Sequence, residues 1–444
     1  MRLRRVAYRQ FRAFSALQHL ARRRLTPAGQ LAAAALLAAA VMGPNTRLTV
    51  AYQVFAFLAA LLALAALWAF LPVPRLGVRR VLPRLATAGE PFTYRLVVAN
   101  PGRAAERGLT VLEDLEDPRP SFEEFASSPE PDEARRNRFD RAVGWPRWAW
   151  LVERRRRVVI SPLPLDPVPP GGALEARVTV TPRSRGRLAF TGATLSRPDP
   201  LGLVRACVPM EAPGSLLVLP RRYPAPALGL ASGRRYQHGG VALSTSVGDS
   251  EEFQSLREYR PGDPPRRIHW RSWAHVGKPV VREYQDEFFV RHGLILDTFV
   301  AGAEGPRFEE AVSVAASFAC SVETQESLLD LMFVGPQAYT FTAGRGVGNV
   351  ERMLEVLACV RPCRDRPFAA LHRLVVERHA ALSGAICVLL EWDAPRRALV
   401  TFLRAAGVPS VVLHVVDEGA AGDGRPDGVH RLEVGRIAEG LRRL

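Results

Sequence analysis

The chain has 444 residues, a formal net charge of +16 and 48% hydrophobic residues. This length allows two or more hydrophobic cores, because single domains usually contain about 100 to 200 residues. Thirteen arginines precede Glu90, the first acidic residue, so the rest of the chain is nearly neutral. A charge gathered at one end argues against nucleic-acid binding, which needs a basic patch on a folded domain. We therefore expect no nucleic-acid partner.

Residues 1–25 contain eight arginines and no acidic residue. We interpret them as a basic cytoplasmic segment that forms an amphipathic helix on anionic lipid. Residues 26–72 contain two apolar runs. The first ends at Met42 and is barely long enough to cross about 30 Å of hydrocarbon, whereas the second, Val50–Leu71, is long and uncharged. These runs predict a two-helix transmembrane anchor.

The arginines also predict the orientation of this anchor. They lie before and after the two apolar runs, and only Arg47 lies between them, so the positive-inside rule places both ends in the cytoplasm. A signal peptide is the alternative, but no small-residue cleavage site follows the first run. We expect a multi-pass protein of the cell inner membrane, with membrane lipid as a partner and the bulk of the chain cytoplasmic.

Short alternating strands bounded by Gly, Pro and Asn predict an antiparallel β-sandwich over residues 76–225. Residues 113–170 do not fit this pattern and are interpreted as an insertion. Its part from 117 to 140 is rich in Pro, Glu, Ser and Arg, which is typical of a flexible excursion. The tryptophans that follow, including Trp148, favour a strand that continues to Ile160. A segment that dips into the membrane interface is the alternative.

The five cysteines are scattered and form no CxxC pair. Cys359 and Cys363 are near each other, but no second ligand pair accompanies them, which argues against a zinc site. Reduced thiols in a cytosolic domain fit this pattern best. The apolar surroundings of Cys207, Cys320 and Cys387 predict that these three fill core space.

Residues 226–287 contain a linker and then a charged segment that is the least random part of the chain. Acidic and basic residues interleave there with aromatic residues, which is typical of a folded, ion-paired patch. Pro261 is followed by turn-forming residues, and Val280–Glu283 alternates like a strand. We expect Trp270 to be buried and Arg257 or Arg267 to pair with an acid, because an unpaired arginine beside buried indoles is costly.

This charged segment resembles the signature of the domain-of-unknown-function-58 (DUF58) family. The matching residues are Glu252, Phe253, Leu256, Arg257, Tyr259, Gly262, Asp263, Arg266, Arg267, Ile268, Trp270 and Glu283. Two positions depart from the family pattern: His269 stands where an acid is usual, and Trp273 where a small residue is usual. The resemblance implies a membrane-anchored bacterial protein, usually encoded beside a MoxR-type AAA+ ATPase.

Strands and helices alternate over residues 288–444, which predicts a doubly wound α/β domain whose mostly parallel sheet is covered on both faces. Gly335 and Pro336 form a short connection that predicts one antiparallel edge. The resemblance also implies a von Willebrand factor A-like domain here. The predicted fold is therefore multi-domain: a transmembrane hairpin, an antiparallel β-sandwich and this α/β domain.

Asp297 follows the first strand of this domain, at the carboxyl edge where such sheets bind ligands. A metal-dependent adhesion site needs the pattern DxSxS, but Phe299 and Ala301 replace both hydroxyl residues. Glu391 and Asp393 end the next buried strand and are the other weak candidates for Mg²⁺ ligands. We therefore expect no metal cofactor and interpret Asp297 as a helix-capping or loop-bonding residue.

The sequence contains no GxSxG, phosphate-loop or HExxH motif. We expect a non-enzymatic, membrane-tethered cytoplasmic adaptor or scaffold that works with a MoxR-type ATPase in complex assembly or envelope maintenance. The partner-binding candidates are Arg260, Arg266, Arg271 and Trp273, because arginine and aromatic residues dominate interface energetics. The alternative is an extracytoplasmic metal-dependent binding module or an enzyme acting on envelope material. The sequence does not indicate an oligomeric state.

Overall fold

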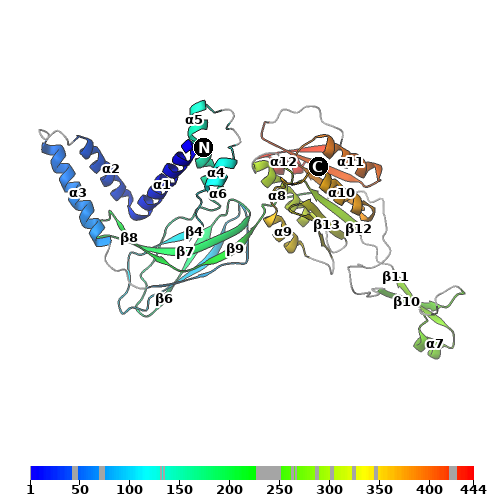
Figure 1. The fold of residues 1–444 in the computed structure, drawn as a ribbon. Helices are drawn as coiled ribbons and strands as arrows, with labels where there is room; N and C mark the ends of the chain where they lie inside the picture. The colour runs from blue at the N-terminus through cyan, green and yellow to red at the C-terminus, as the bar shows by residue number, and fades with distance from the viewer. Residues whose placement is uncertain are drawn as a thin grey trace. The chain divides into compact units, whose positions relative to one another are not determined.

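The chain divides into two compact units, Met1–Arg221 and Arg222–Leu444 (Figure 1). Each unit has its own hydrophobic core. The protein is therefore multi-domain. The computed structural model describes residues 2–42, 49–69, 76–130, 133, 136–226, 252–261, 265, 268–285, 290–300, 305–322, 327–344, 349–419 and 428–444.

Three helices open the first unit: α1 (Arg2–Arg24), α2 (Pro27–Met42) and α3 (Thr49–Ala69). Within α3, Val50–Ala69 has a mean hydropathy of 2.3 and 20 residues, enough to cross a membrane by length and composition. It is the one such helix in the described part of the chain, since the apolar Pro27–Val41 is shorter. The two apolar helices α2 and α3 pack against each other.

Two sheets enclose the core of the first unit. One has the order β1-β3-β6 and the other β2-β9-β7-β4-β5, with β8 paired to β7. Along β3 the inward-facing Tyr94, Leu96 and Val98 are buried at every second position, as the period of a strand requires. The strands are β1 (Gly77–Val81), β2 (Leu85–Thr87), β3 (Phe92–Ala99), β4 (Thr110–Leu115), β5 (Leu163–Pro164), β6 (Ala173–Val180), β7 (Gly186–Pro198), β8 (Arg205–Met210) and β9 (Gly214–Leu219).

The start of α2 is attached to the turn between β7 and β8. The amide of Thr26 donates to the carbonyl oxygen of Leu203 at 3.0 Å, and the Thr26 hydroxyl accepts from the amide of Gly29. A Cβ at Gly29 would lie 1.9 Å from the same carbonyl oxygen, so only glycine allows this close approach. The Asp199 carboxylate organises the turn by accepting from the amides of Leu203 and Val204 at 2.7 Å each.

The structure differs from the prediction over residues 113–170, where a flexible excursion and a strand were expected. Between the end of β4 and the start of β5 the described residues include three helices, and the strand predicted through Trp148 is wrong. Gly144, with a φ of 78°, ends the second helix, and Pro146 lies in the first turn of the third. Trp148 and Leu151 are both buried, three positions apart, which is a helical spacing. The helices are α4 (Phe122–Ser127), α5 (Arg138–Val143) and α6 (Trp145–Arg155).

These helices form a small aromatic core with α1. Tyr8 lies edge-on to Trp148, with ring centroids 5.5 Å apart, and both pack against Phe125. The Trp148 indole N–H donates to the Ser15 hydroxyl at 3.1 Å. The helix predicted for residues 1–25 is therefore present, but one of its faces packs on protein and is not free to lie on lipid.

The second unit contains a two-stranded sheet, β10-β11, and a six-stranded sheet in the order β14-β13-β12-β15-β16-β17. The antiparallel edge predicted at Gly335 and Pro336 is confirmed, because β13 and β14 are antiparallel and the other neighbours in this sheet are parallel. The first part is β10 (Glu252–Glu258), α7 (Trp270–Val276), β11 (Val280–Gln285), β12 (Val290–Leu296), α8 (Pro306–Ser321), β13 (Ser327–Val334) and β14 (Ala338–Ala343). The second part is α9 (Val350–Cys359), α10 (Ala369–Arg378), a 3₁₀ turn (His379–Ala381), β15 (Gly384–Leu389), α11 (Ala394–Ala405), β16 (Ser410–Val416), β17 (Val429–Glu433) and α12 (Ile437–Leu441).

Helices cover both faces of the larger sheet. Helices α10 and α11 share a core with Ile295 of β12 on one face. Helix α8 packs against β12, β15 and β16 on the other (Figure 1). Strands β13 and β15 are buried along their whole length, as expected for central strands covered on both sides. The strand order reverses between β12 and β15, so the carboxyl ends of these two neighbours form a switch point where such sheets bind ligands.

The cysteines expected to fill core space do so only in part. Cys387 is buried in β15, and burial raises the pKa of its thiol to about 12. Cys207 is half-buried, and Cys320 is exposed near the end of α8, so the prediction for Cys320 is wrong. An apolar sequence neighbourhood does not show which face of a helix a residue occupies.

Candidate functional site

The charged segment forms a small structure that we call the signature module: β10, α7 and β11. The two strands are antiparallel, with Arg257 opposite Val281. The amide of His269, at the start of α7, donates to the carbonyl oxygen of Val280 at 2.8 Å. Gly277, with a φ of 74°, ends the helix. The strand predicted from Val280 is confirmed (Figure 1).

Trp270 is 64% exposed, so the prediction that it is buried is wrong. Its indole stacks on that of Trp273, with ring centroids 5.1 Å apart and an interplanar angle of 21°. Leu256 and Val276 add exposed apolar surface to the module. A two-stranded sheet with one seven-residue helix offers little interior. The Trp270 indole therefore remains at the surface, stacked on the half-buried Trp273.

The described basic residues of the module lie at its surface. Arg260 and Arg271 are exposed. Arg257 donates to the carbonyl oxygen of Glu258 at 3.2 Å, and Lys278 lies 3.2 Å from the Glu258 carboxylate. The other singled-out residues are Glu252, Phe253 and Glu283, whose backbone lies in β10 and β11, and Gly262, Asp263, Arg266 and Arg267, which lie outside the described residues.

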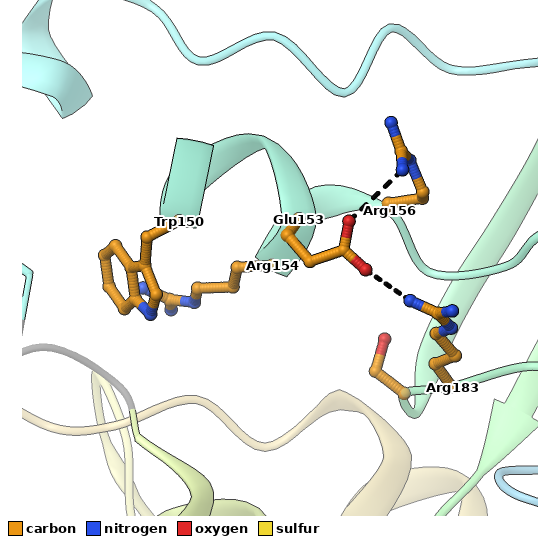
Figure 2. Close-up of a pocket in the computed structure, with 6 residues that line it drawn as sticks. Trp150, Glu153, Arg154, Arg156 and Arg183 are labelled. Carbon is orange, nitrogen blue, oxygen red and sulfur yellow. Dashed lines mark hydrogen bonds and ion pairs between the residues drawn. The ribbon is translucent and has the colours of Figure 1, made fainter. Parts of the chain in front are cut away.

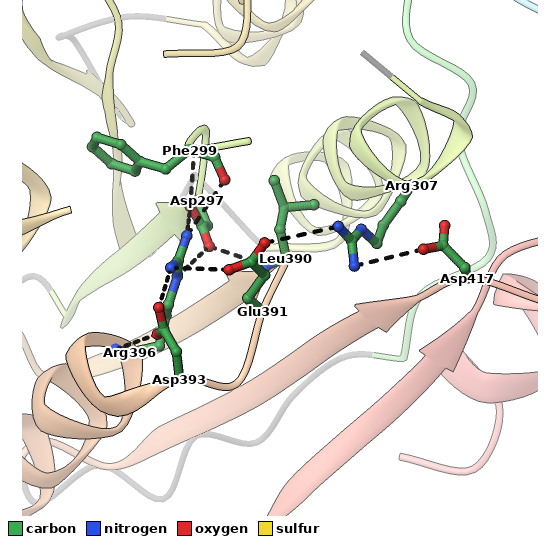
Figure 3. Close-up of polar contacts among 8 residues, drawn as sticks. All are labelled: Asp297, Phe299, Arg307, Leu390, Glu391, Asp393, Arg396 and Asp417. Carbon is green, nitrogen blue, oxygen red and sulfur yellow. Dashed lines mark hydrogen bonds and ion pairs between the residues drawn. The ribbon is translucent and has the colours of Figure 1, made fainter. Parts of the chain in front are cut away.

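A second candidate site lies at the switch point of the larger sheet, around Asp297. This residue follows β12 and is fully buried. One carboxylate oxygen accepts from the amide of Phe299 at 3.0 Å, and the other from the amide of Leu390 at 3.1 Å (Figure 3). The interpretation of Asp297 as a loop-bonding residue is confirmed, because it joins the ends of β12 and β15.

Arg396 is the cation of this site, and the sequence analysis missed it. Its guanidinium donates to Asp297 at 3.0 Å and to Asp393 at 2.6 Å, and it lies 3.5 Å from Glu391 (Figure 3). Asp393 also caps α11 by accepting from the Arg396 amide, which places the arginine in the first turn of the helix. The guanidinium lies over the Phe368 ring. The three residues named as weak candidates for metal ligands therefore all pair with one arginine.

Burial and charge act against each other at this buried pair. Burial raises the pKa of the Asp297 carboxyl, while Arg396 and two backbone amides oppose the rise. Burial disfavours the charged guanidinium of Arg396, but Asp297 and Asp393 hold its pKa above the ordinary value. Arg307 extends the network outward to Asp417 at 3.6 Å. The site is thus a network of paired charges.

The residues at this edge do not fit a divalent cation. Both carboxylate oxygens of Asp297 already accept hydrogen bonds, and a metal would have to displace Arg396. The hydroxyl of the next residue, Thr298, donates to the carbonyl oxygen of Val334. Over the described ranges, no group of three or more His, Cys, Asp and Glu residues is placed to hold a metal.

We expect Mg²⁺ to leave the melting temperature of the full chain in detergent unchanged. A ligand that binds only the native state stabilises it by RT ln(1 + [L]/Kd), so a real site would produce a rise. The measurement compares thermal melts in Mg²⁺ and in EDTA, with Asp297→Asn as the control variant. A rise that Asp297→Asn abolishes would show that this edge binds metal.

A shallow pocket lies beside the end of α6 in the first unit (Figure 2). Glu153 stands between two arginines, 3.2 Å from Arg156 and also paired with Arg183. The Arg154 guanidinium lies 5.3 Å from the Trp150 ring centroid. The three arginines thus have contacts within the protein, and the pocket presents no convergent set of reactive groups.

Taken by its fold, the chain is a multi-domain protein that joins apolar helices and β-sheets to an α/β unit. The family model described as "Protein of unknown function DUF58" matches residues 255–417. This range runs from β10 to Asp417, so the signature module from residue 255 and the Asp297–Arg396 network lie within it. The match agrees with the resemblance seen in the charged segment.

Two known proteins show partial similarity. The uncharacterized protein YeaD of Bacillus subtilis (strain 168) is 28% identical over 178 residues. That alignment covers 39% of this chain and 42% of YeaD, so it spans less than half of that relative. A solution NMR structure of a CARDB domain from Pyrococcus furiosus aligns with 33% of this chain and 97% of its own, at 13% identity and a TM-score of 0.18. The latter similarity is too low to carry an argument.

Proposed function

We propose that the chain is a membrane-tethered, non-enzymatic adaptor that docks a partner protein through its signature module. The observation that carries this proposal is the exposed Trp270, stacked on the half-buried Trp273. Tryptophan and arginine are enriched at interface hot spots, and the exposed Arg260 and Arg271 belong to the same module. The resemblance to the DUF58 family favours a MoxR-type AAA+ ATPase as the partner, in complex assembly or envelope maintenance.

The tether in this proposal is α3, with α2 as a second span of the inner membrane. The two helices pack together, and arginines flank the pair on both sides. We infer that the two-sheet core is a β-sandwich and that residues 288–444 form a von Willebrand factor A-like domain. The sheet order with its antiparallel edge strand supports the second inference.

The charge network supports an adaptor more than an enzyme or a metal-dependent module. In such sheets the carboxyl edge supplies the ligand site, and here Arg396 occupies the acids of that edge. An internal ion pair thus holds the acids of this edge. This leaves the signature module as the surface with the strongest claim to a partner.

A reporter fused after Leu444 should be active only in the cytoplasm, because arginines lie on both sides of the apolar helices. The measurement compares a cytoplasmic reporter with a periplasmic one at the same position. Activity of the periplasmic reporter alone would contradict the adaptor, since a cytosolic ATPase would not reach the docking surface. It would favour the extracytoplasmic binding module or enzyme instead.

Replacing Trp270 and Trp273 by alanine should weaken capture of the neighbouring ATPase by more than about tenfold, because hot-spot truncations cost about 2 kcal/mol or more. The measurement is binding of the purified ATPase to the full chain in detergent. The matched control is Tyr339→Ala, which removes another exposed ring, stacked on Phe333 at 5.2 Å. Equal capture by the double variant and the control would place the docking surface elsewhere.

A further inference from the structure

Helix α1 has a second apolar face that no described residue of the protein covers. Val6, Leu17 and Leu20 are 56%, 63% and 54% exposed. At about 100° per residue, these three share one side of the helix and Tyr8 lies roughly opposite. Tyr8 is 8% exposed, because its side packs against α4 and α6. The helix thus has two apolar faces. One packs against α4 and α6, and the other is exposed.

The free face continues onto α6 through aromatic contacts. Trp145, at the start of α6, is 41% exposed, and its ring centroid lies 6.2 Å from that of Phe14 on α1, itself 50% exposed. Phe11 lies behind them, 5.1 Å from Trp145. The buried Trp148 and its hydrogen bond to Ser15 hold the two helices together. We call the surface formed by Val6, Phe14, Leu17, Leu20 and Trp145 the platform.

The charge of α1 indicates what covers this platform. The helix contains eight arginines and no acidic residue. Arginines beside an apolar face with an indole at its edge suit the boundary between anionic headgroups and acyl chains. A soluble protein partner would instead need a matching acidic and apolar surface.

The position of α1 in the chain supports the same occupant. The helix ends at Arg24, and α2 begins at Pro27, with Thr26 attached to the first unit at Leu203. Figure 1 shows α1 and α2 diverging from this attachment, with α4, α5 and α6 beyond α1. The face of α1 opposite those helices therefore turns toward the side on which the apolar helices lie.

We propose that the platform lies in the interfacial layer of an anionic bilayer, beside the α2–α3 hairpin. The first unit is then held against the membrane at two points, the apolar helices and the platform. The contacts of α1 with α6, and of Thr26 with the β7–β8 turn, fix the orientation of the first unit relative to the membrane. This inference rests on the membrane tether of the proposed function, and it is independent of partner docking by the signature module.

Spin labels on the full chain in lipid nanodiscs test the platform. Cys207, Cys320 and Cys359 are first replaced by serine to remove thiols that are not fully buried. A nitroxide is then attached at Leu17→Cys or Trp145→Cys. Two further labels serve as references: Leu64→Cys on α3 reports insertion, and Glu90→Cys, in an exposed turn of the first unit, reports water. Collisions with oxygen and with a nickel chelate are measured by power saturation.

We expect the ratio of oxygen to nickel accessibility at Leu17 and Trp145 to be several times that at Glu90. We also expect it to be higher in discs of phosphatidylcholine with phosphatidylglycerol than in phosphatidylcholine alone. A water-like ratio at both positions, with Leu64 immersed, would overturn the platform while leaving the tether intact. Immersion of Leu17 without Trp145 would overturn the claim that α1 and α6 form the platform together. Exclusion of both reagents would show a protein cover, and an equal ratio in the two lipids would overturn the anionic assignment.

Partner capture and platform immersion use different residues and different readouts. Loss of capture in the Trp270 and Trp273 double variant leaves the labels on α1 and α6 unaffected. A water-like label at Leu64 would instead show that α3 does not span, which contradicts the tether itself. The failure of the proposed function and the failure of the platform are therefore distinguishable.

Discussion

Replacing Arg396 by alanine should destabilise the second unit by about 3 to 5 kcal/mol, because it leaves the buried Asp297 carboxylate without its cation. Asp297 is 0% exposed, and Arg396 is 5% exposed. The variant also removes the arginine's bond to Asp393 and its contact with the Phe368 ring. We would measure urea unfolding of the full chain in detergent, following a probe in the second unit.

The matched control is the neighbouring arginine, Arg397, whose side chain is exposed. Arg397→Ala should change the free energy of unfolding by about 0.5 kcal/mol or less. The double variant Asp297→Asn with Arg396→Met should recover part of the loss, because it no longer buries an unpaired charge. Equal effects of Arg396→Ala and Arg397→Ala would show that the network does not stabilise the switch point.

Replacing Trp148 by alanine should destabilise the first unit by about 3 to 5 kcal/mol, the range for truncating a large buried aromatic residue. Its side chain is 1% exposed and lies between Tyr8 of α1 and Phe125 of α4. The change also leaves the Ser15 hydroxyl without its indole donor. Urea unfolding followed by a probe on α1 would measure the loss.

Trp270→Ala is the control for this variant, since it removes the same side chain from an exposed position. We expect it to cost about 0.5 kcal/mol or less, because Trp270 is 64% exposed. A large loss for Trp270→Ala would restore the interpretation of Trp270 as a core residue. A Trp148→Ala chain that unfolds like the parent would show that α1 is not held by the aromatic core.

Local patterns predicted the alternation of strands and helices after residue 288, although not every element of it. The predicted alternation is present from β12 (Val290–Leu296) through α8 (Pro306–Ser321) to β13 (Ser327–Val334). The short Gly335–Pro336 connection predicted the antiparallel edge that β13 and β14 form. Such features depend on residues that are close in the chain, where the period of burial differs between helix and strand. The last strand and helix, β17 and α12, were not predicted.

The amino-acid sequence by itself determined the apolar N-terminal helices, the alternating α/β unit and the position of Asp297 after the first strand of that unit. Only the tertiary structure decided that Arg396, 99 residues further on, pairs with Asp297. It also decided that α6 is a helix packed on α1 and that Trp270 stays at the surface. The physical reason is the same in each case. Burial and charge pairing depend on which distant segments come into contact, and residue spacing along the chain does not determine those contacts.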